Sequence, residues 1–461
     1  MTNCSVFIDR AIFFIYTIHK DQKVFNEFPA LHAQCRTEDE KMSIFYVSAQ
    51  GCDTNDGLSP ESAVKTLAQV QKLMVGGDTV RLHCGDTFYG RVATPAGPDP
   101  EHPTTFESYG EGEKPVISQY KMANPGSWEK HEEGVYKLNL VKDGKVAEHI
   151  YGNVTEPDAN IGFMKVSGEI KYRKKFRYEE LAEQWDFYCD DENIYVKLDK
   201  CPCEYSDDIK LACGVRMFAF ANNIRVTDIV FRGGGSHGIS GVVKGAYIGN
   251  CEFHELGGSR LGGLERNGKF NTTRYGNGVE CWSNSYNVTV ENCKFSEIYD
   301  VAITMQGNLV KVNWNNMHFR NNVIWKCVQA FEIWSSGEEP DTGFTNCYFE
   351  NNVCIDSGYG WGYDARPNKH VTAHLLIYGL QCPLCDITVR NNILSTAREN
   401  TIFKSGGIAA FPKGYKIYDN TIIRPAGQDI IRKESATDEQ MAEFEKMIAE
   451  NNNVYDMVVY P

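Results

Sequence analysis

Seven short segments of the sequence align with one another without gaps. They read IRVTDIVF, AYIGNCEF, VTVENCKF, MHFRNNVI, CYFENNVC, ITVRNNIL and YKIYDNTI, and they begin at residues 224, 246, 288, 317, 347, 387 and 415. The first, third and eighth positions are apolar in all seven segments. A unit that recurs at a spacing of a few tens of residues is typical of an architecture built by stacking repeats.

The sixth position of these segments indicates the shape of each repeat. Its occupants are Ile229, Cys251, Cys293, Asn322, Asn352, Asn392 and Asn420. The apolar alternation slips by one residue between the third and sixth positions, as expected where one strand turns a corner into the next. Asn side chains at such a corner can stack and bond the backbone of successive repeats.

These features predict an all-β fold, a single-stranded right-handed parallel β-helix in which each coil lies on the one before it. The regular coils are 22–30 residues long, and the two longer intervals contain loop excursions. The leucine spacing of a leucine-rich repeat is absent, and the period is too short and uneven for a propeller.

The segments around the repeats suggest how the chain is divided. Residues 1–41 match nothing that follows and form an extension of uncertain order; residues 42–119 form the N-terminal cap and first coils, and residues 216–432 the main β-helix. Residues 120–215 interrupt the repeat with strand-like stretches around a helical YEELAEQ, which predicts an inserted β-rich module. Residues 433–461 form a C-terminal helix and tail.

Two helices are expected at the ends of the β-helix. SPESAVKTLAQVQKLMVGG places Val64, Leu67, Val70 and Met74 on one face, with Pro60 near the start and glycines at the end. Such a helix would cover the open strand edges of the first coil. Thr437 and Gln440 form a capping box for a last helix over residues 438–450.

Composition narrows the range of partners. The net charge is −14, so a nucleic-acid partner is not expected. No segment reaches the roughly 20 apolar residues of a membrane-spanning helix. The apolar run AIFFIYTI, residues 11–18, lacks the flanks of a signal peptide, which favours a cytoplasmic location over secretion. The 16 irregularly spaced cysteines are expected to be buried free thiols. The oligomeric state is left open.

Three stretches resemble a known group of proteins. FYVSAQGCDTNDGLSPESAVKTL (residues 45–67), RYGNGVECW (residues 274–282) and IYDVAITMQG (residues 298–307) are similar to right-handed parallel β-helix proteins of the pectate-lyase-like superfamily. The resemblance covers about residues 42–430. It implies a carbohydrate partner and a substrate groove along one outward sheet face, where catalytic carboxylates or basic residues stand. The Asp-pair motifs of polygalacturonases are absent, so that activity does not carry over.

The strand that follows each corner carries the candidate catalytic residues. Alternation points Val279, Ile303 and Phe331 inward, which leaves Glu280, Thr304 and Glu332 side by side on the outward face. Asp300 lies at the corner before Thr304. With strands about 4.8 Å apart, Glu280 and Glu332 would be about 10 Å apart at the backbone. Converging carboxyl groups could then reach the separation found in inverting glycosidases.

Candidate substrate-binding residues surround this ladder. Trp282, Gln306 and Trp334 occupy its next outward positions, and exposed indoles on one ladder suit stacking on sugar rings. The remaining candidates are Arg274 and Asn277 before Glu280, and Trp361 and His374 in the second excursion. The excursions over residues 256–273 and 358–374 are expected to form the groove walls. The alternatives are a solvent-exposed charge for each Glu, a turn-bonding role for Asp300 and a structural ion pair for Arg274.

Three functions remain open from the sequence. The first is a glycoside hydrolase without cofactor or metal, acting on an oligo- or polysaccharide with Glu332 as general acid and another of the three carboxyl groups as base. The second is a polysaccharide lyase or uronate epimerase, with Ca²⁺ held by the acidic cluster and Arg274 or His374 as base. The third is a non-catalytic carbohydrate-binding protein. The geometric expectation common to these is that Glu280, Thr304 and Glu332 point to solvent from adjacent coils.

Overall fold

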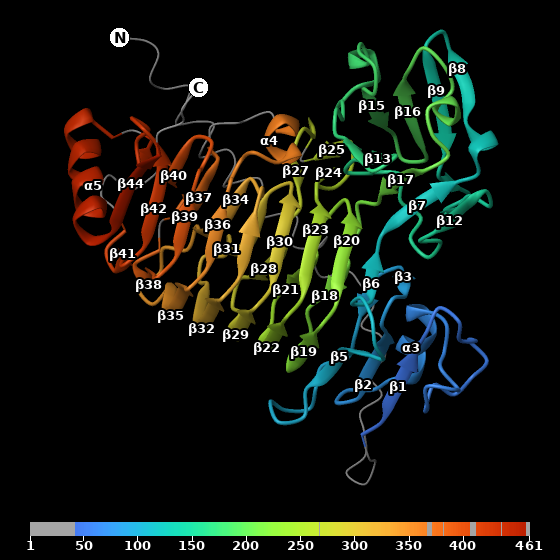
Figure 1. Cartoon of the computed structure of the whole chain (residues 1–461), viewed down its shortest axis with the longest axis horizontal. Coiled ribbons are helices and arrows are strands. Elements are labelled where there is room, and N and C mark those ends of the chain that lie inside the picture. Colours follow the sequence, from blue (N-terminus) through green and yellow to red (C-terminus); the bar gives the residue numbers. More distant parts are fainter. Residues whose placement is uncertain are drawn as a thin grey trace.

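The computed structural model describes residues 42–266, 268–366, 371–380, 382–405, 412–434 and 436–457. The predicted residues 1–41 extension lies outside this part of the chain. Within it, three long parallel sheets wind into a β-helix (Figure 1). Each coil contributes one strand to each sheet, and we name the sheets A, B and C in the order in which a coil reaches them.

The three sheets have nine or ten strands each. Within each sheet, hydrogen-bonded neighbours follow one another in the order below. Sheet A contains β1 (Ile44–Val47), β2 (Thr79–His83), β5 (Thr104–Tyr109), β19 (Ile224–Thr227), β22 (Lys244–Gly249), β29 (Tyr286–Glu291), β32 (Asn313–Arg320), β35 (Gly343–Glu350), β38 (Leu384–Arg390) and β41 (Tyr415–Tyr418). Sheet B contains β3 (Thr87–Tyr89), β6 (Val116–Ser118), β20 (Val230–Gly234), β23 (Glu252–Leu256), β30 (Lys294–Ile298), β33 (Val323–Trp325), β36 (Val353–Ile355), β39 (Ile393–Ser395), β42 (Thr421–Pro425) and β44 (Asn453–Met457). Sheet C contains β4 (Val92–Ala93), β18 (Phe218–Ala219), β21 (Ile239–Gly241), β28 (Val279–Trp282), β31 (Val301–Gly307), β34 (Gln329–Ser335), β37 (Ala373–Tyr378), β40 (Asn400–Lys404) and β43 (Ile431–Lys433).

The corner between sheets A and B explains the aligned segments. Its fifth position has a positive φ in every copy and is always Asn or Asp: Asp228, Asn250, Asn292, Asn321, Asn351, Asn391 and Asp419. Asn and Asp tolerate this left-handed conformation better than other residues with a Cβ. The left-handed residue bends the chain from one sheet to the next, which is the predicted slip in the alternation.

The sixth position forms the predicted Asn ladder inside the corner. The Oδ1 atom of Asn352 accepts hydrogen bonds from the backbone N of Asn322 at 2.9 Å and from its Nδ2 at 3.0 Å. Asn392 repeats both bonds toward Asn352, and Asn420 repeats them toward Asn392. Buried backbone donors need such acceptors, so the ladder holds the stacking register of the coils.

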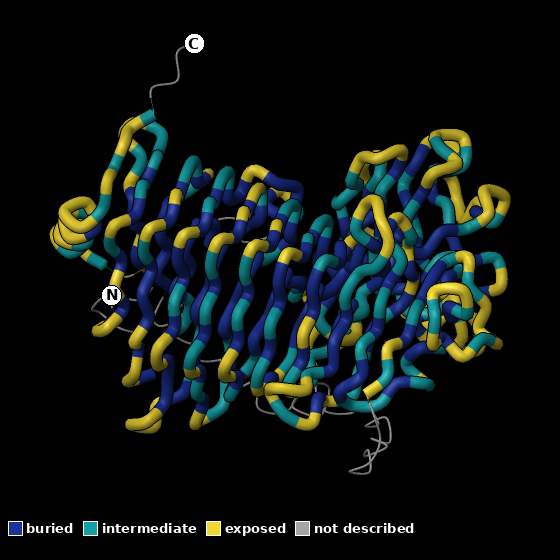
Figure 2. Tube along the Cα trace, turned by 60° about the horizontal axis from the view of Figure 1, so that its bottom comes forward, coloured by how far each residue is buried: buried dark blue, intermediate teal, exposed yellow. Residues whose placement is uncertain are grey.

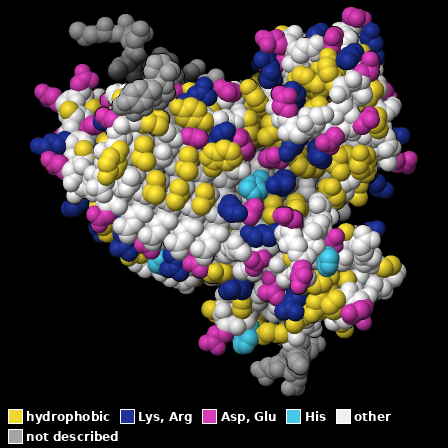
Figure 3. All heavy atoms as spheres, in the orientation of Figure 1, with side chains coloured by type: hydrophobic (Ala, Val, Ile, Leu, Met, Phe, Trp, Pro, Cys, Tyr) yellow, Lys and Arg dark blue, Asp and Glu magenta, His cyan; other side chains and the backbone are white. Residues whose placement is uncertain are grey.

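Apolar side chains fill the interior of the coils. Phe231, Phe253 and Phe295 stack in sequence, with ring centroids 5.0 and 4.7 Å apart. Figure 2 shows buried residues running along the β-helix, whereas exposed residues collect at its corners and ends. Figure 3 shows hydrophobic side chains gathered in rows on one face of the β-helix. Exposed apolar side chains at outward positions of sheet B include Val323, Trp325 and Ile393.

Both ends of the β-helix have the expected helix. At the N-terminal end, α3 (Leu67–Leu73) buries Leu67 and Val70 but begins later than predicted. Thr66 is its N-cap, because Val64 instead pairs with Val47 as an isolated β-bridge. At the C-terminal end, α5 (Asp438–Asn451) has the predicted capping box. The following strand β44 returns the chain to sheet B.

The segment between β6 and β18 forms a separate antiparallel body with its own apolar core. One sheet contains β7 (Tyr120–Ala123), β12 (Ile150–Gly152), β13 (Met164–Val166), β14 (Glu169–Lys171) and β17 (Ile209–Ala212). The other contains β8 (Glu129–Glu132), β9 (Val135–Asn139), β15 (Phe187–Cys189) and β16 (Asn193–Lys197), beside a hairpin of β10 (Val141–Lys142) and β11 (Lys145–Val146). Three 3-10 turns, η2 (Pro125–Ser127), η3 (Tyr178–Glu180) and η4 (Pro202–Glu204), complete it. The expected helix in YEELAEQ is wrong, since only η3 forms there.

The described cysteines are free thiols, most of them buried. No helix of the described residues is long and apolar enough to cross a membrane.

Candidate active site

The outward ladder of sheet C has the predicted register. Glu280 on β28 pairs with Thr304 on β31, which in turn pairs with Glu332 on β34. Their inward neighbours Val279, Ile303 and Phe331 lie in the core. The two glutamates therefore leave the β-helix on the same side, with one strand between them.

The expectation that these residues point to open solvent is wrong. Glu280 is 3% exposed and Glu332 is 7% exposed, and both line a pocket of ≈ 360 Å³. Two chain excursions contribute to its walls, as predicted. Residues 257–278 include the hairpins β24 (Ser259–Arg260) with β27 (Arg274–Tyr275) and β25 (Glu265–Arg266) with β26 (Lys269–Phe270), and residues 356–372 include α4 (Trp361–Ala365). The described lining is His237, Leu261, Arg266, Thr272, Thr273, Arg274, Tyr275, Asn277, Glu280, Trp282, Tyr299, Asp300, Gln306, Glu332, Trp334, Arg366, Val371, Leu376 and Tyr378.

Glu332 is the most strongly perturbed carboxyl group of the pocket. Burial and the nearby charge of Asp300 raise its pKa to about 8, against the opposing effects of Thr304 and Arg366. The Thr304 hydroxyl donates to Oε2 of Glu332 at 2.8 Å. Because its pKa lies above neutrality, Glu332 carries a proton at pH 7 that it can donate.

Glu280 has a different environment. Nε2 of Gln306 donates to its Oε1, and Nε2 of His237 lies 3.4 Å from its Oε2. The backbone N of Asn277 donates to Nδ1 of His237 at 3.0 Å, which places the proton of the neutral ring on Nε2. Burial lowers the pKa of His237, so the ring is neutral at pH 7. Two N–H groups are thus directed at the Glu280 carboxylate.

Asp300 lies where the sequence predicted it, at the corner that leads into the middle strand. Its Oδ1 forms an ion pair with Nη1 of Arg366 at 2.5 Å. Interaction with Asp300 raises the pKa of Arg366 against the effect of burial. Among the residues that the structure describes, the buried Nε atom of Arg366 has no hydrogen-bond partner. Asp300 is therefore an ionised neighbour of Glu332, held on the pocket wall by Arg366.

Arg274 and Asn277 both line the pocket and hold its walls together. The guanidinium of Arg274 donates to the carbonyl oxygens of Gly258, Ala365 and Gly162, which join both excursions to the inserted module. Its charge also lies 4.8 Å from the ring centre of Tyr299. The side-chain Oδ1 of Asn277 accepts from the backbone N of Val301. Both side chains thus make structural contacts, and substrate contact by either remains a prediction.

The predicted indole and amide positions of the next outward row are in the pocket. Trp282, Gln306 and Trp334 follow one another on adjacent strands. The Trp282 and Trp334 rings lie 6.1 Å apart at an interplanar angle of 56°. All three side chains are partly exposed, unlike the carboxyl groups below them. They form a rim on which a sugar ring can stack.

The structure places the other two predicted binding residues outside the pocket lining. Trp361 packs against Phe163 and Tyr299 and donates from Nε1 to the carbonyl of Glu297. His374 is buried between Ser357 and the carbonyl of Ser395, and burial lowers its pKa to about 4. Trp361 therefore joins the inserted module to the β-helix, and His374 is a neutral residue of the corner.

Three tyrosines of the lining, Tyr378, Tyr275 and Tyr299, were missed by sequence reasoning. On the neighbouring strand β37, Tyr378 pairs with Trp334 and continues the indole row. Leu376 on the same strand pairs with Glu332 and continues the carboxylate row. This strand begins only after the second excursion. A fixed residue count from the corner therefore ends inside the excursion and does not reach the strand. Tyr275 and Tyr299 lie next to the predicted candidates Arg274 and Asp300 in the sequence but were not singled out themselves. The short, nearly continuous apolar run AHLLIY, residues 373–378, was the signal that could have found β37.

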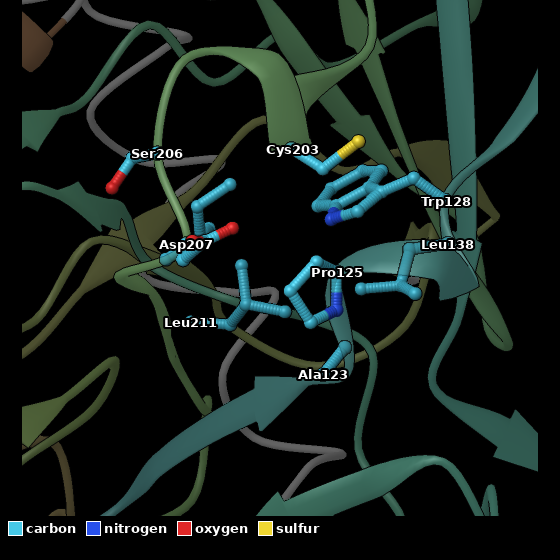
Figure 4. A pocket seen from close by; sticks show the side chains of 9 residues that line it. Ala123, Pro125, Trp128, Leu138, Cys203, Ser206, Asp207 and Leu211 are labelled. Carbon is cyan, nitrogen blue, oxygen red and sulfur yellow. The ribbon is translucent and has the colours of Figure 1, made fainter.

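Other candidate sites are less developed. No three His, Cys, Asp or Glu side chains of the described residues group as metal ligands would. A second cavity within the inserted module, between Trp128, Leu138 and Leu211, has a volume of ≈ 10 Å³ (Figure 4). That is room for about one water molecule.

No model of a known protein family matches the sequence, and no curated protein sequence matches it either. Solved structures with a similar course of the chain include the complex of XylC with xylose, at 13% identity and a TM-score of 0.48, covering 90% of this chain and 82% of that one. A GH136 lacto-N-biosidase from Eubacterium ramulus has 13% identity and a TM-score of 0.38, over 90% and 68% of the two chains. A rhamnogalacturonan lyase has 11% identity and a TM-score of 0.33, over 90% and 87%. At these identities and TM-scores, the similarities assign no activity to this chain.

Proposed function

We propose that the protein is a glycoside hydrolase in which Glu332 is the general acid and Glu280 the general base. The observation that carries this proposal is one pocket in which a protonated carboxyl group and a carboxylate lie on strands separated by a single strand. The rim of two indoles supports a sugar as the ligand, since aromatic faces suit the apolar side of a sugar ring.

The proposed reaction uses each carboxyl group once. Glu332 donates its proton to the glycosidic oxygen as the bond from that oxygen to the anomeric carbon breaks. Glu280 takes a proton from a water molecule whose oxygen attacks the anomeric carbon from the opposite face. Because Glu280 acts on water and not directly on the sugar, the reaction inverts the anomeric carbon. Solvent then returns a proton to Glu332 and removes one from Glu280.

The contacts around the pair support this division of roles. His237 and Gln306 present N–H groups to Glu280, as a carboxylate requires. Asp300 stays beside Glu332 as a negative charge, which favours the protonated acid before catalysis and opposes its ionisation. In the lyase alternative, Arg274 or His374 would be the base. Arg274 donates to three carbonyl groups and His374 does not line the pocket, so hydrolysis is the better supported proposal.

The test is a panel of neutral and acidic oligosaccharides incubated with the wild-type protein, Glu332→Gln and Glu280→Gln. We expect new reducing ends from at least one neutral glycan, with rates about 100-fold or more lower in both variants. An ultraviolet-absorbing unsaturated product from a uronate glycan would instead identify a lyase. Wild-type rates in both variants would refute the assignment.

A further inference from the structure

The pocket is closed on the sides where an extended polysaccharide groove would have to continue. In the carboxylate row of sheet C, Glu332 is followed by Leu376 on β37 and Phe403 on β40. Leu376 is 4% exposed and Phe403 is 0% exposed. Leu376 still belongs to the described pocket lining but Phe403 does not, so a sugar chain cannot continue along this row past β37.

The opposite flank is also covered. Glu280 is preceded in the row by Ser240 on β21, which is 2% exposed. Nη1 of Arg216 donates to the carbonyl of Ser240 at 3.3 Å, so this side chain lies against the strand. His237 and Tyr275, with ring centres 4.9 Å apart, stand on the same side of Glu280. Of this row, Glu280, Glu332 and Leu376 belong to the described pocket lining, and Ser240 does not.

The corner end of the pocket is lined by largely buried side chains, beside which Arg366 and Asp300 keep 12% and 21% of their side-chain surface exposed. Tyr299, Asn277 and Arg274 are 1%, 3% and 8% exposed, respectively. The ring of Tyr299 is held between the guanidinium groups of Arg274 and Arg366, at 4.8 and 5.4 Å from its centre. Lining residues that retain exposure include Trp282, Gln306 and Trp334 at the strand ends and Thr272 in the first excursion. The exposed Thr272 and the partly exposed indole row therefore mark one side on which the rest of a bound chain can leave the pocket.

The charge of the pocket bears on the kind of sugar unit that enters. Arg366 is paired with Asp300, and Arg274 donates to backbone carbonyl groups. With Glu332 protonated, the Glu280 carboxylate remains close to the reacting bond. A uronate beside the carboxyl groups would face the charges of Glu280 and Asp300, and the third arginine of the lining, Arg266, belongs to the β25 hairpin of the first excursion. This arrangement suits a neutral terminal unit.

From these observations we infer that the enzyme acts at chain ends, taking a neutral terminal sugar unit into the blind pocket and leaving the remainder of the chain against the indole rim. This inference rests on the proposed hydrolase function and adds its mode of action. A volume of ≈ 360 Å³ is near the lower limit for ligand pockets, which suits one or two sugar rings in place of a long chain segment.

The test measures cleavage and binding separately. For cleavage, a linear neutral oligosaccharide series is compared with cyclic oligosaccharides of the same linkage, and products are separated at low conversion. We expect one short product from every linear chain and a kcat/KM about 100-fold lower for the cyclic substrate. A mixture of fragment lengths from the first time points, or equal cleavage of cyclic substrate, would overturn the inference while leaving the hydrolase assignment intact.

For binding, calorimetry is performed with Glu332→Gln on the same compounds. We expect affinity to stop rising once the chain fills the pocket and rim, and the cyclic compounds not to bind. Chain-end binding by this variant, together with no cleavage by the wild-type protein of any glycan tested, would sustain the chain-end inference and refute the hydrolase function. Affinity that keeps rising with chain length, or binding of neither form, would overturn the inference.

Discussion

Replacing Glu332 by Gln should make the protein more stable at alkaline pH while abolishing its activity. Burial and Asp300 raise the pKa of Glu332 from an ordinary 4.5 to about 8. The folded protein therefore holds this proton more tightly than the unfolded chain does. The free energy of unfolding falls as pH rises between these two values, because ionising Glu332 is harder in the folded state.

The expected magnitude follows from the size of the shift. A difference of about 3.5 pKa units corresponds to about 5 kcal/mol, the full amount being lost above pH 8. Gln is nearly isosteric with the protonated acid and does not ionise, so the variant avoids this loss. We expect Glu332→Gln to match the wild type near pH 4.5 and to exceed it by up to about 5 kcal/mol above pH 8. A substitution that removes activity but raises stability is the pattern expected of a catalytic group whose burial lowers the stability of the fold.

Urea denaturation of both proteins at a series of pH values measures this difference. Glu107→Gln is the matched control, since it removes a carboxylate from the partly exposed ion pair with Arg81 on sheet A, far along the chain from the pocket. For the control variant, the free energy of unfolding relative to wild type should not increase with pH as it does for Glu332→Gln. Parallel stability profiles for wild type and Glu332→Gln across this pH range would refute a raised pKa at Glu332.

Three further changes have defined outcomes. Glu280→Gln should lower kcat by about 10²- to 10⁴-fold with a small change in KM, because a general base acts in the transition state. Steady-state kinetics on an active substrate measures this change, and an unchanged kcat would contradict the role. Trp334→Ala should weaken glycan binding by about 2- to 10-fold through loss of aromatic contact, measured by calorimetry with Tyr247→Ala on sheet A as control; equal effects of the two would speak against the rim. Asn352→Ala should lower the free energy of unfolding by about 2–5 kcal/mol, since it removes the acceptor of two buried donors of Asn322; a urea midpoint unchanged from wild type would count against the ladder.

The sequence was sufficient to predict the β-helix because the corner repeats in every coil. Asn and Asp at the left-handed position and Asn at the stacked position are local requirements, so they are visible as columns. The same register correctly predicted that Glu280, Thr304 and Glu332 pair across three strands. The alternation of apolar residues along a strand indicates which side of the sheet each residue faces, and it can be recognised from neighbouring residues in the sequence.

Which segments cover the outward face of sheet C depends on contacts between residues far apart in the sequence, and sequence reasoning was insufficient to predict them. Nothing in the alternation shows that the excursions bury Glu280 and Glu332, because their path depends on long-range contacts such as those of Arg274 with Gly162 and Ala365. Trp361 was expected in the site for its residue type, but it packs against Phe163 of the inserted module. The strand β37 was missed because an insertion of variable length precedes it, so a fixed count from the corner fails there.

The configuration of the first product tests the paired-carboxylate mechanism most directly. Proton NMR of a reaction in progress, on whichever oligosaccharide proves to be a substrate, reports the anomer released before mutarotation. Glu280 activates a water molecule and does not itself attack the sugar, so the mechanism predicts inversion at the anomeric carbon. Release of the retained anomer would contradict it, because retention requires a carboxylate close enough to attack the sugar itself.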